Sequence, residues 1–311
     1  MDIDRAIEYV QSRGDVVERS RLAAILFDRP AGPYTLRQMD VRQAPDGGFA
    51  VEGPACSTVS ATVHALYHCD DLHIRQGTLV QAACLFLLQR RCLDGGWDEV
   101  AAVRSASPPP WLAPGRLETR LWLTGCCAHV LMLMGFAPNS TDHSPSRFLT
   151  AFQDELGLIG GDLLTTWVAL PSLAHDPGPA SVEYRQALSA CDSHYTGQES
   201  PSFTAWMLRC LRDAAVPVDH PLVGRALESL ARTQRSDGGW ASADENGNGA
   251  GATVQVLGAF QGYGLIHSAP PAPAEAPRTA RRLEWQPGSL APFLPPPKVG
   301  AEVGSWARFV N

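Results

Sequence analysis

A motif that combines glutamine, aspartate, two glycines and an aromatic residue occurs three times in the 311-residue chain. Each copy follows one apolar run with helical spacing and precedes a second one. A repeated helical hairpin has no way to bury its apolar face alone, so neighbouring copies must stack on one another. The motif therefore predicts an all-α protein built from helix pairs. The three copies are Gln43–Phe49, Gln89–Trp97 and Gln234–Trp240.

Each position of the motif has a predicted structural role. Two adjacent glycines adopt backbone angles that a side chain forbids, so the preceding helix can end sharply. The aspartate is expected to accept hydrogen bonds from nearby backbone N–H groups, and the glutamine to bond the helix end or the next loop. The aromatic side chain buries a large apolar area beside the turn. The motif thus predicts architecture rather than chemistry.

The spacing of the motif predicts the number of units. Phe49 and Trp97 lie 48 residues apart, and Trp97 and Trp240 lie 143 apart, close to three times that interval. We therefore expect two eroded units between them, with Gly157–Gly161 and Thr196–Ser200 in place of the motif. Six units of about 48 residues would fill nearly the whole chain. A sixth unit is either incomplete or is closed by the predicted helix at residues 2–13.

The Gln…Asp-Gly-Gly-Trp pattern resembles the QW motif of squalene-hopene and oxidosqualene cyclases. It is also similar to the repeats of protein prenyltransferase β subunits and class II diterpene cyclases. The resemblance implies a single-domain (α/α)6 toroidal barrel, in which inner and outer helices alternate around a central cavity. We expect the barrel to occupy residues 1–267. The Pro-rich segment 268–311 is interpreted as a linker and a tail that packs on or closes the barrel.

Apolar periodicity predicts the helices of five pairs after the first two short helices. The predicted outer helices are Thr35–Arg42, Leu79–Gln89, Ser146–Leu156, Ser181–Cys191 and Pro221–Gln234. The predicted inner helices are Cys56–Cys69, Leu117–Met134, Asp162–Leu173, Ser202–Ala214 and Gly249–Tyr263.

Composition is that of an ordinary soluble globule, with 45% hydrophobic residues, 18% charged residues and a net charge of −7. The chain has no basic stripe, which argues against a nucleic-acid partner. We expect no secretory signal and no transmembrane helix, because the first residues are polar and no apolar run reaches about 18 residues. Peripheral contact of an apolar patch with a membrane stays open. Eight cysteines without a Cys-x-x-Cys pair favour a reduced, cytoplasmic protein, and no cofactor is expected.

Class II terpene cyclases protonate an alkene with the central acid of an Asp-x-Asp-Asp motif near the start of an inner helix. The resemblance therefore implies a carboxyl group held neutral by burial. At the matching place this chain has Cys56–Ser60, which contains no carboxylate. Glu118 and Asp162 begin two other inner helices on one rim, and they are the candidate catalytic acids. The structural alternatives are a first-turn acid or an ion pair with Arg120 for Glu118, and an N-cap for Asp162.

Two histidines within inner helices, His64 and His129, are further catalytic candidates. A buried neutral histidine can act as a base or a donor near pH 7, although a hydrogen-bonded core histidine is the commoner case. Aromatic faces on inner helices can stabilise a carbocation, or they can simply fill the centre of the barrel. The candidate substrate-binding residues are Trp122, Trp167, Phe203 and Trp206.

Two further clusters are interpreted as structural. Asp70 and Asp71 end the first inner helix, where we expect a solvated helix terminus. Protein prenyltransferases bind zinc through Asp, Cys and His, and the nearest match here is Cys126, Cys127 and His129. Adjacent cysteines on a helix point about 100° apart, so core packing is favoured over a metal site.

These features favour an isoprenoid-cyclase-like enzyme, an isomerase or lyase, that acts on an apolar polyene or prenylated small molecule by acid–base carbocation chemistry. It would lack the usual Asp-x-Asp-Asp acid. The alternative is a non-catalytic barrel that binds an apolar ligand or a partner protein. Zinc-dependent prenyl transfer is a weaker alternative. The chain contains no Asp-Asp-x-x-Asp sequence of the kind used for Mg²⁺-dependent ionisation.

Overall fold

The computed structural model describes residues 1–50, 56–106, 108–136, 143–242 and 249–266. In these residues the protein is all-α, with twelve α-helices and two short 3-10 helices, which confirms the predicted fold class at that level. The predicted linker and tail at 268–311 lie outside the described residues.

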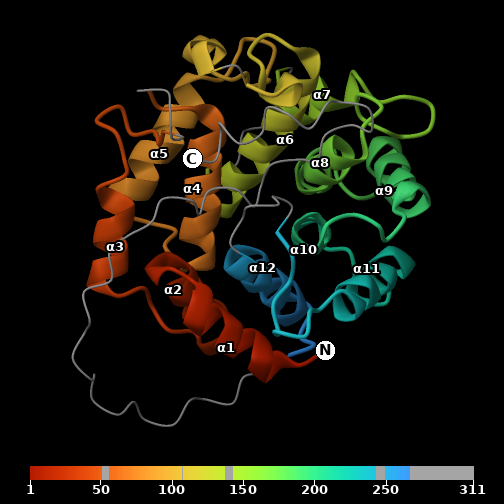
Figure 1. Ribbon diagram of the computed structural model, residues 1–311. Helices are drawn as coiled ribbons and strands as arrows, with labels where there is room; N and C mark the ends of the chain where they lie inside the picture. The colour runs from red at the N-terminus through yellow and green to blue at the C-terminus, as the bar shows by residue number, and fades with distance from the viewer. Residues whose placement is uncertain (51–55, 107, 137–142, 243–248, 267–311) are drawn as a thin grey trace.

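Along the chain, helices on the outside of the molecule alternate with helices nearer its middle (Figure 1). The odd-numbered helices are α1 (Ile3–Arg13), α3 (Pro33–Asp40), α5 (Thr78–Gln89), α7 (Pro145–Thr150), α9 (Val182–His194) and α11 (Pro221–Arg232). The even-numbered helices are α2 (Val16–Phe27), α4 (Val59–Asp71), α6 (Leu117–Leu133), α8 (Leu163–His175), α10 (Pro201–Asp213) and α12 (Gly249–Gly262). The 3-10 helices η1 (Ala101–Ala106) and η2 (Pro110–Leu112) lie in the Pro-rich loop after Trp97.

The even-numbered helices contact one another in a closed circuit. Contacts run from α2 to α4, α6, α8, α10 and α12 in turn, and α12 returns to α2. Each odd-numbered helix packs against at least one even-numbered neighbour. Most residues of α4, α6 and α8 are buried, whereas α11 buries one face, as expected for helices inside and outside a circuit.

The first helix pair closes the circuit. Helix α1 contacts both α2 and α12. The side chain of Gln234, which follows α11, accepts from the backbone N–H of Asp2 and donates to its carbonyl, each at 2.7 Å. Gly238 lies against the carbonyl of Arg5. Of the two possibilities that the sequence left open, the closing role of residues 2–13 is therefore the one that the contacts support.

In the first copy of the motif, the glutamine and the aspartate have the predicted roles. Gln43 donates through Nε2 to the carbonyls of Gly47 (2.8 Å) and Leu79 (2.9 Å), which ties the turn after α3 to the start of α5. Oδ1 of Asp46 accepts from the backbone N–H of Gly48 at 3.1 Å. Equivalent aspartate bonds occur at Gly96 and Gly239.

The glycine of the turn is required by two separate constraints. Gly47 has a φ of +85°, in the region that favours glycine. A Cβ atom there would lie 2.5 Å from the carbonyl oxygen of Ala82 in α5, so the turn packs directly on the next outer helix. Gly95, Gly157 and Gly238 show the same positive φ and the same close backbone approach.

A threonine in four of the inner helices, α4, α6, α8 and α12, completes the turn, and the sequence did not predict it. Thr62 accepts from the N–H of Phe49 at 2.9 Å and donates to the carbonyl of Thr58 at 2.7 Å. The hydroxyl thus joins the end of the motif to the first turn of the inner helix. The same pair of bonds is made by Thr124, Thr166 and Thr253.

This pattern corrects the position of the third motif, which the sequence placed at Gly157–Gly161. The structure shows it at residues 153–159, where Gln153 bonds the carbonyls of Gly157 and Glu183 and Ile159 takes the place of the aromatic residue. The same turn ends α7 at Thr150, earlier than the predicted end at Leu156. Loss of the second glycine and of the aromatic residue concealed the motif in the sequence.

Candidate functional site

A cavity of about 320 Å³ lies between α2, α4, α10 and α12. One wall is apolar and includes Ile25, Trp206 and Val254. The other is charged and carries three aspartates and three arginines. These charged residues are Asp70, Asp71, Arg75, Arg209, Arg212 and Asp213.

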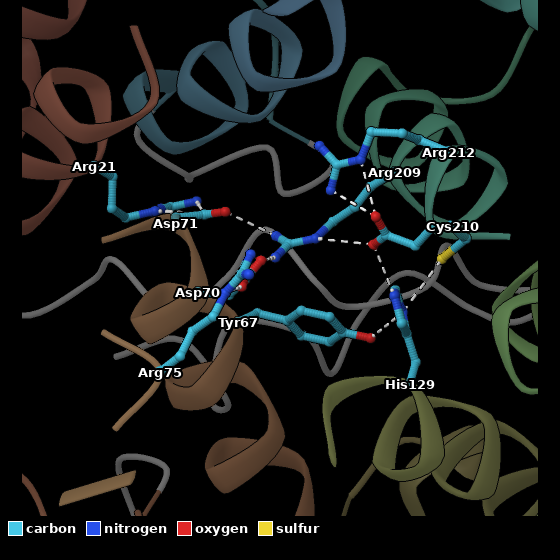
Figure 2. Close-up of polar contacts among 10 residues, drawn as sticks. Arg21, Tyr67, Asp70, Asp71, Arg75, His129, Arg209, Cys210 and Arg212 are labelled. Atoms are coloured by element: carbon cyan, nitrogen blue, oxygen red, sulfur yellow. Dashed lines mark hydrogen bonds and ion pairs between the residues drawn. The ribbon is translucent and has the colours of Figure 1, made fainter. Parts of the chain in front are cut away.

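Arg209 of α10 is the centre of the charged wall (Figure 2). Its Nη1 atom lies 2.8 Å from Oδ1 of Asp71, and its Nη2 atom donates to Asp70. Arg21 of α2 donates to Oδ2 of Asp71 from Nε (2.9 Å) and Nη2 (2.7 Å). Arg75 donates to Oδ1 of Asp70 at 2.7 Å. The network therefore joins three helices of the circuit, α2, α4 and α10.

The prediction that Asp70 and Asp71 form a solvated helix terminus is wrong. Their side chains are only 6% and 12% exposed, and both are paired with arginine. Burial alone would raise the pKa of Asp71, but the guanidinium groups of Arg209 and Arg21 outweigh burial and hold the pKa below its usual value. The partners come from positions 50 and 138 residues away along the chain, so local sequence gave no sign of them.

Asp213 connects the charged wall to His129. Nε2 of His129 lies 2.9 Å from Oδ2 of Asp213, and its Nδ1 lies 2.9 Å from the hydroxyl of Tyr67. If Nε2–H donates to the carboxylate, Nδ1 accepts from the phenol. Burial would raise the pKa of Asp213, but the bond from His129 and the charges of Arg212 and Arg209 hold it well below its usual value. His129 is thus a hydrogen-bonded core histidine that orients a cavity-lining carboxylate.

The two predicted catalytic acids lie away from this cavity. Glu118 is exposed and pairs with Arg116 at 3.4 Å, whereas Arg120 pairs instead with Asp94. Asp162 is the N-cap of α8 and accepts from the backbone N–H of Thr165 at 2.8 Å. Asp162 is therefore the N-cap that the sequence offered as its alternative, and Glu118 is the first-turn acid of α6 that the sequence offered as one of its alternatives.

His64 is buried beside His68, and the two ring centroids are 4.2 Å apart. Burial, with a smaller effect of the Arg21 charge, lowers the pKa of His64 to about 3. Its imidazole is therefore neutral near pH 7. His64 does not line the cavity.

Of the four predicted aromatic residues, Trp206 lines the cavity. Its ring meets Trp122 edge-on at a centroid distance of 6.4 Å and Tyr67 at 6.2 Å. Trp111, from η2, continues the chain of rings with an edge-on contact to Trp122 at 5.6 Å. The structure thus brings Trp122 and Trp206 together into one aromatic cluster. Trp167 and Phe203 are buried in the core and do not line the cavity.

The sequence reading also missed Glu99, in the loop after Trp97. Its carboxylate lies at the first turn of α4 and accepts from the backbone N–H groups of Val59 (2.7 Å) and Ser60 (3.0 Å). Burial raises its pKa, although these bonds oppose the shift. The resemblance places an acid near the start of an inner helix, and here a carboxyl group reaches that place from 40 residues further along the chain.

Besides the Asp70–Asp71 pair, the sign of the charged wall in the sequence is the group Arg209, Arg212 and Asp213 within an otherwise apolar inner helix. Among the residues that the structure describes, no three His, Cys, Asp or Glu side chains are grouped to hold a metal ion. Cys126 and Cys127 are buried in the core. None of the described helices is long and apolar enough to cross a membrane.

No protein-family model matches the sequence, and no curated protein is similar to it by sequence. Solved structures are similar in fold. A protein from Actinoplanes has 18% identity and a TM-score of 0.57, over 84% of this chain and 98% of that one. Type II terpene cyclase MstE from Scytonema has 16% identity and a TM-score of 0.58, over 83% and 96%.

A variant of MstE was solved in complex with geranylgeranyl dihydroxybenzoate, its substrate. It has 14% identity and a TM-score of 0.59, over 85% of this chain and 97% of that one. At these identities the likeness is one of fold, so the chain is similar in architecture to a type II terpene cyclase.

Proposed function

We propose that the chain is an (α/α)6 toroidal barrel and a type II terpene cyclase-like enzyme that acts on a prenylated small molecule. The observation that carries the proposal is the cavity inside the helix circuit, whose wall at Trp206 continues into the cluster of Tyr67 and Trp122. Aromatic faces stabilise positive charge, so they suit a reaction that passes through carbocations. The likeness of fold to MstE supports the same class of reaction.

The cavity carboxylates would act on positive charge rather than supply the first proton. The pKa values of Asp71 and Asp213 are lowered, so both are ionised near pH 7. The proton donor must then be another carboxyl group. Glu118 and Asp162 stay candidates from the sequence, and Glu99 joins them because its burial raises its pKa at the start of an inner helix.

Incubation of the purified protein with geranylgeranyl dihydroxybenzoate, followed by mass spectrometry with chromatography, tests the proposal. We expect an isomeric product of unchanged mass and shorter retention time, because cyclisation removes double bonds without loss of atoms. Glu99→Gln, Glu118→Gln and Asp162→Asn, assayed in parallel, identify the acid as the variant in which product formation falls at least a hundredfold. Equal rates in all three variants would remove all three assignments.

The second candidate function is a barrel that binds its ligand without turnover. It is favoured by the ionised state of the cavity carboxylates and by the exposed, ion-paired position of Glu118. Saturable binding of the prenylated compound with no product after prolonged incubation would support this function and contradict the enzymatic one.

A further inference from the structure

We propose that the cavity between α2, α4, α10 and α12 is a binding site for a small organic acid. Its carboxylate would meet Arg75 and Arg212, and its hydrocarbon body would lie against the apolar wall at Ile25 and Val254. The proposal uses the same cavity as the proposed function and names a chemical group that this cavity binds. It concerns binding alone, so it is tested without turnover.

The acceptors of the charged wall are already used. The two oxygens of Asp70 take Arg75 and Arg209, and those of Asp71 take Arg209 and Arg21. The two oxygens of Asp213 take Arg212 and His129. Every carboxylate oxygen of the wall therefore has a donor, so the wall presents no unpaired carboxylate oxygen to a cation.

The donors of the wall are not used up. A guanidinium group has five N–H bonds, but the bond from Arg75 to Asp70 uses only Nε. Arg212 uses Nε and Nη2, both on Oδ1 of Asp213. The other terminal nitrogens of these two arginines have no partner among the described residues, and their side chains are 58% and 35% exposed. The terminal nitrogens of Arg75 and Arg212 can therefore donate hydrogen bonds to a bound ligand.

The charge balance favours an anion with a single charge. Four guanidinium groups, those of Arg21, Arg75, Arg209 and Arg212, face three carboxylates, which leaves an excess of one positive charge. A carboxylate also matches the fork geometry of arginine, because its two oxygens accept parallel N–H bonds. A diphosphate would bring more negative charge than the wall can neutralise.

Gln255 of α12 gives an independent indication of a polar guest. It lines the cavity, and both polar atoms of its amide are buried without a hydrogen-bond partner among the described residues. A buried unpaired amide destabilises the folded protein, so a partner that occupies the space beside it would be favoured. The carboxylate or a polar substituent of the acid would supply that partner.

The apolar wall shows that the guest is more than an inorganic ion. Ile25, Ala205, Val254 and Ala259 offer a surface that only a hydrocarbon group would cover. The volume of about 320 Å³ is at the lower end for small-molecule sites, which suits an aromatic or short aliphatic acid.

Isothermal titration calorimetry with 4-butylbenzoate tests the proposal, with 4-butylbenzamide as a probe of the same shape without charge. We expect the acid to bind at least tenfold more tightly than the amide, and the difference to shrink at high salt. Equal affinity of the two probes would overturn the proposal. A tenfold preference for 4-butylphenyl phosphate over the benzoate would overturn the assignment to a carboxylate.

Arg75→Gln and Arg212→Gln should each weaken binding of 4-butylbenzoate at least tenfold. Arg232→Gln, which removes an exposed arginine of α11, is the matched control and should leave the affinity unchanged. Unchanged affinity in both cavity variants would overturn the assignment.

Gln255→Leu keeps the proposal testable if an arginine variant fails to fold. Because leucine removes an unpaired buried amide, we expect a higher midpoint of thermal unfolding together with weaker binding of 4-butylbenzoate. A higher midpoint with undiminished binding would show that the amide does not meet the guest. Product formation is not measured in any of these experiments, so their failure is distinct from failure of the proposed reaction.

Discussion

The two ends of the even-numbered helices are built in different ways. Where these helices begin, the same turn is used repeatedly, with a glycine on a neighbouring carbonyl and a threonine beneath the motif. Where α4 and α10 end, a single network of arginines and aspartates, joined by Arg21 of α2, lines a cavity. Repetition stabilises the helix circuit at one end, which leaves the other end available for residues that occur only once.

We call the end of the helices that carries the arginine–aspartate network the unique end, and the end that carries the turns the repeated end. The largest effect on stability should come from a substitution at the unique end. Arg209→Met removes the cation shared by Asp70 and Asp71 and leaves buried carboxylates without it. We expect a loss of about 4 kcal/mol in the free energy of unfolding, measured by urea denaturation. A loss below about 1 kcal/mol would show that the network behaves like a surface ion pair.

The second largest effect on stability should come from a substitution at the repeated end, where α1 and the turn after α11 close the helix circuit. Gly238→Ala places a Cβ atom 2.4 Å from the carbonyl oxygen of Arg5, at a residue with a φ of +89°. Left-handed strain and overpacking together predict a loss of about 3 kcal/mol in the same measurement.

Gly224→Ala is the matched control, because this glycine lies within α11 with nothing within 4 Å of the added atom. It should raise stability by about 0.5–1 kcal/mol. Equal effects of the two substitutions would show that the glycine of the turn is not required for closure.

Low pH should destabilise the protein by protonating the aspartates of the unique end. The folded-state pKa values of Asp71 and Asp213 are lowered, so their contribution is complete above the unfolded value of about 3.9 and is lost as the pH falls further. Asp213→Asn should cost about 2 kcal/mol at pH 7 and reduce the slope of stability against pH below pH 4. Urea midpoints between pH 2.5 and 7 check both expectations, and an unchanged slope would contradict them.

The smallest effect should be at the aromatic position of the repeat. Trp240→Phe removes the bond from Nε1 to the carbonyl of Leu230, at 2.8 Å. Phe49 already occupies the equivalent place in the first copy, so the turn itself should persist. We expect a loss of about 1 kcal/mol in thermal or urea unfolding. A loss as large as that of Gly238→Ala would mean that the ring, rather than the glycine, holds the turn.

The turns of the repeated end could be predicted from the sequence because their hydrogen bonds join residues that are close together in the chain. Gln43, Asp46 and Gly47 act within a few residues of one another, so their spacing reveals the turn. The eroded copy at residues 153–159 shows the limit of this reasoning, since it keeps the bonds of Gln153 but not the glycine pair or the aromatic residue.

The unique end could not be predicted in the same way. Asp71 looks like any helix terminus until Arg21 and Arg209 are brought to it by the fold, and Glu99 reaches α4 only through the path of a long loop. Burial and partners, rather than residue type, decide what these groups do. The aromatic residues of inner helices were identifiable, but which of them meets a cavity depended on their position in space.

The bonds between Gln234 and Asp2 span 232 residues of the chain. Contacts that distant form late, because most of the polypeptide must be ordered before they can be made. During synthesis, α1 and α2 therefore leave the ribosome long before the helices that cover them. Their apolar faces stay uncovered in that interval, so we expect α1 and α2 to depend on a chaperone until α12 has been synthesised.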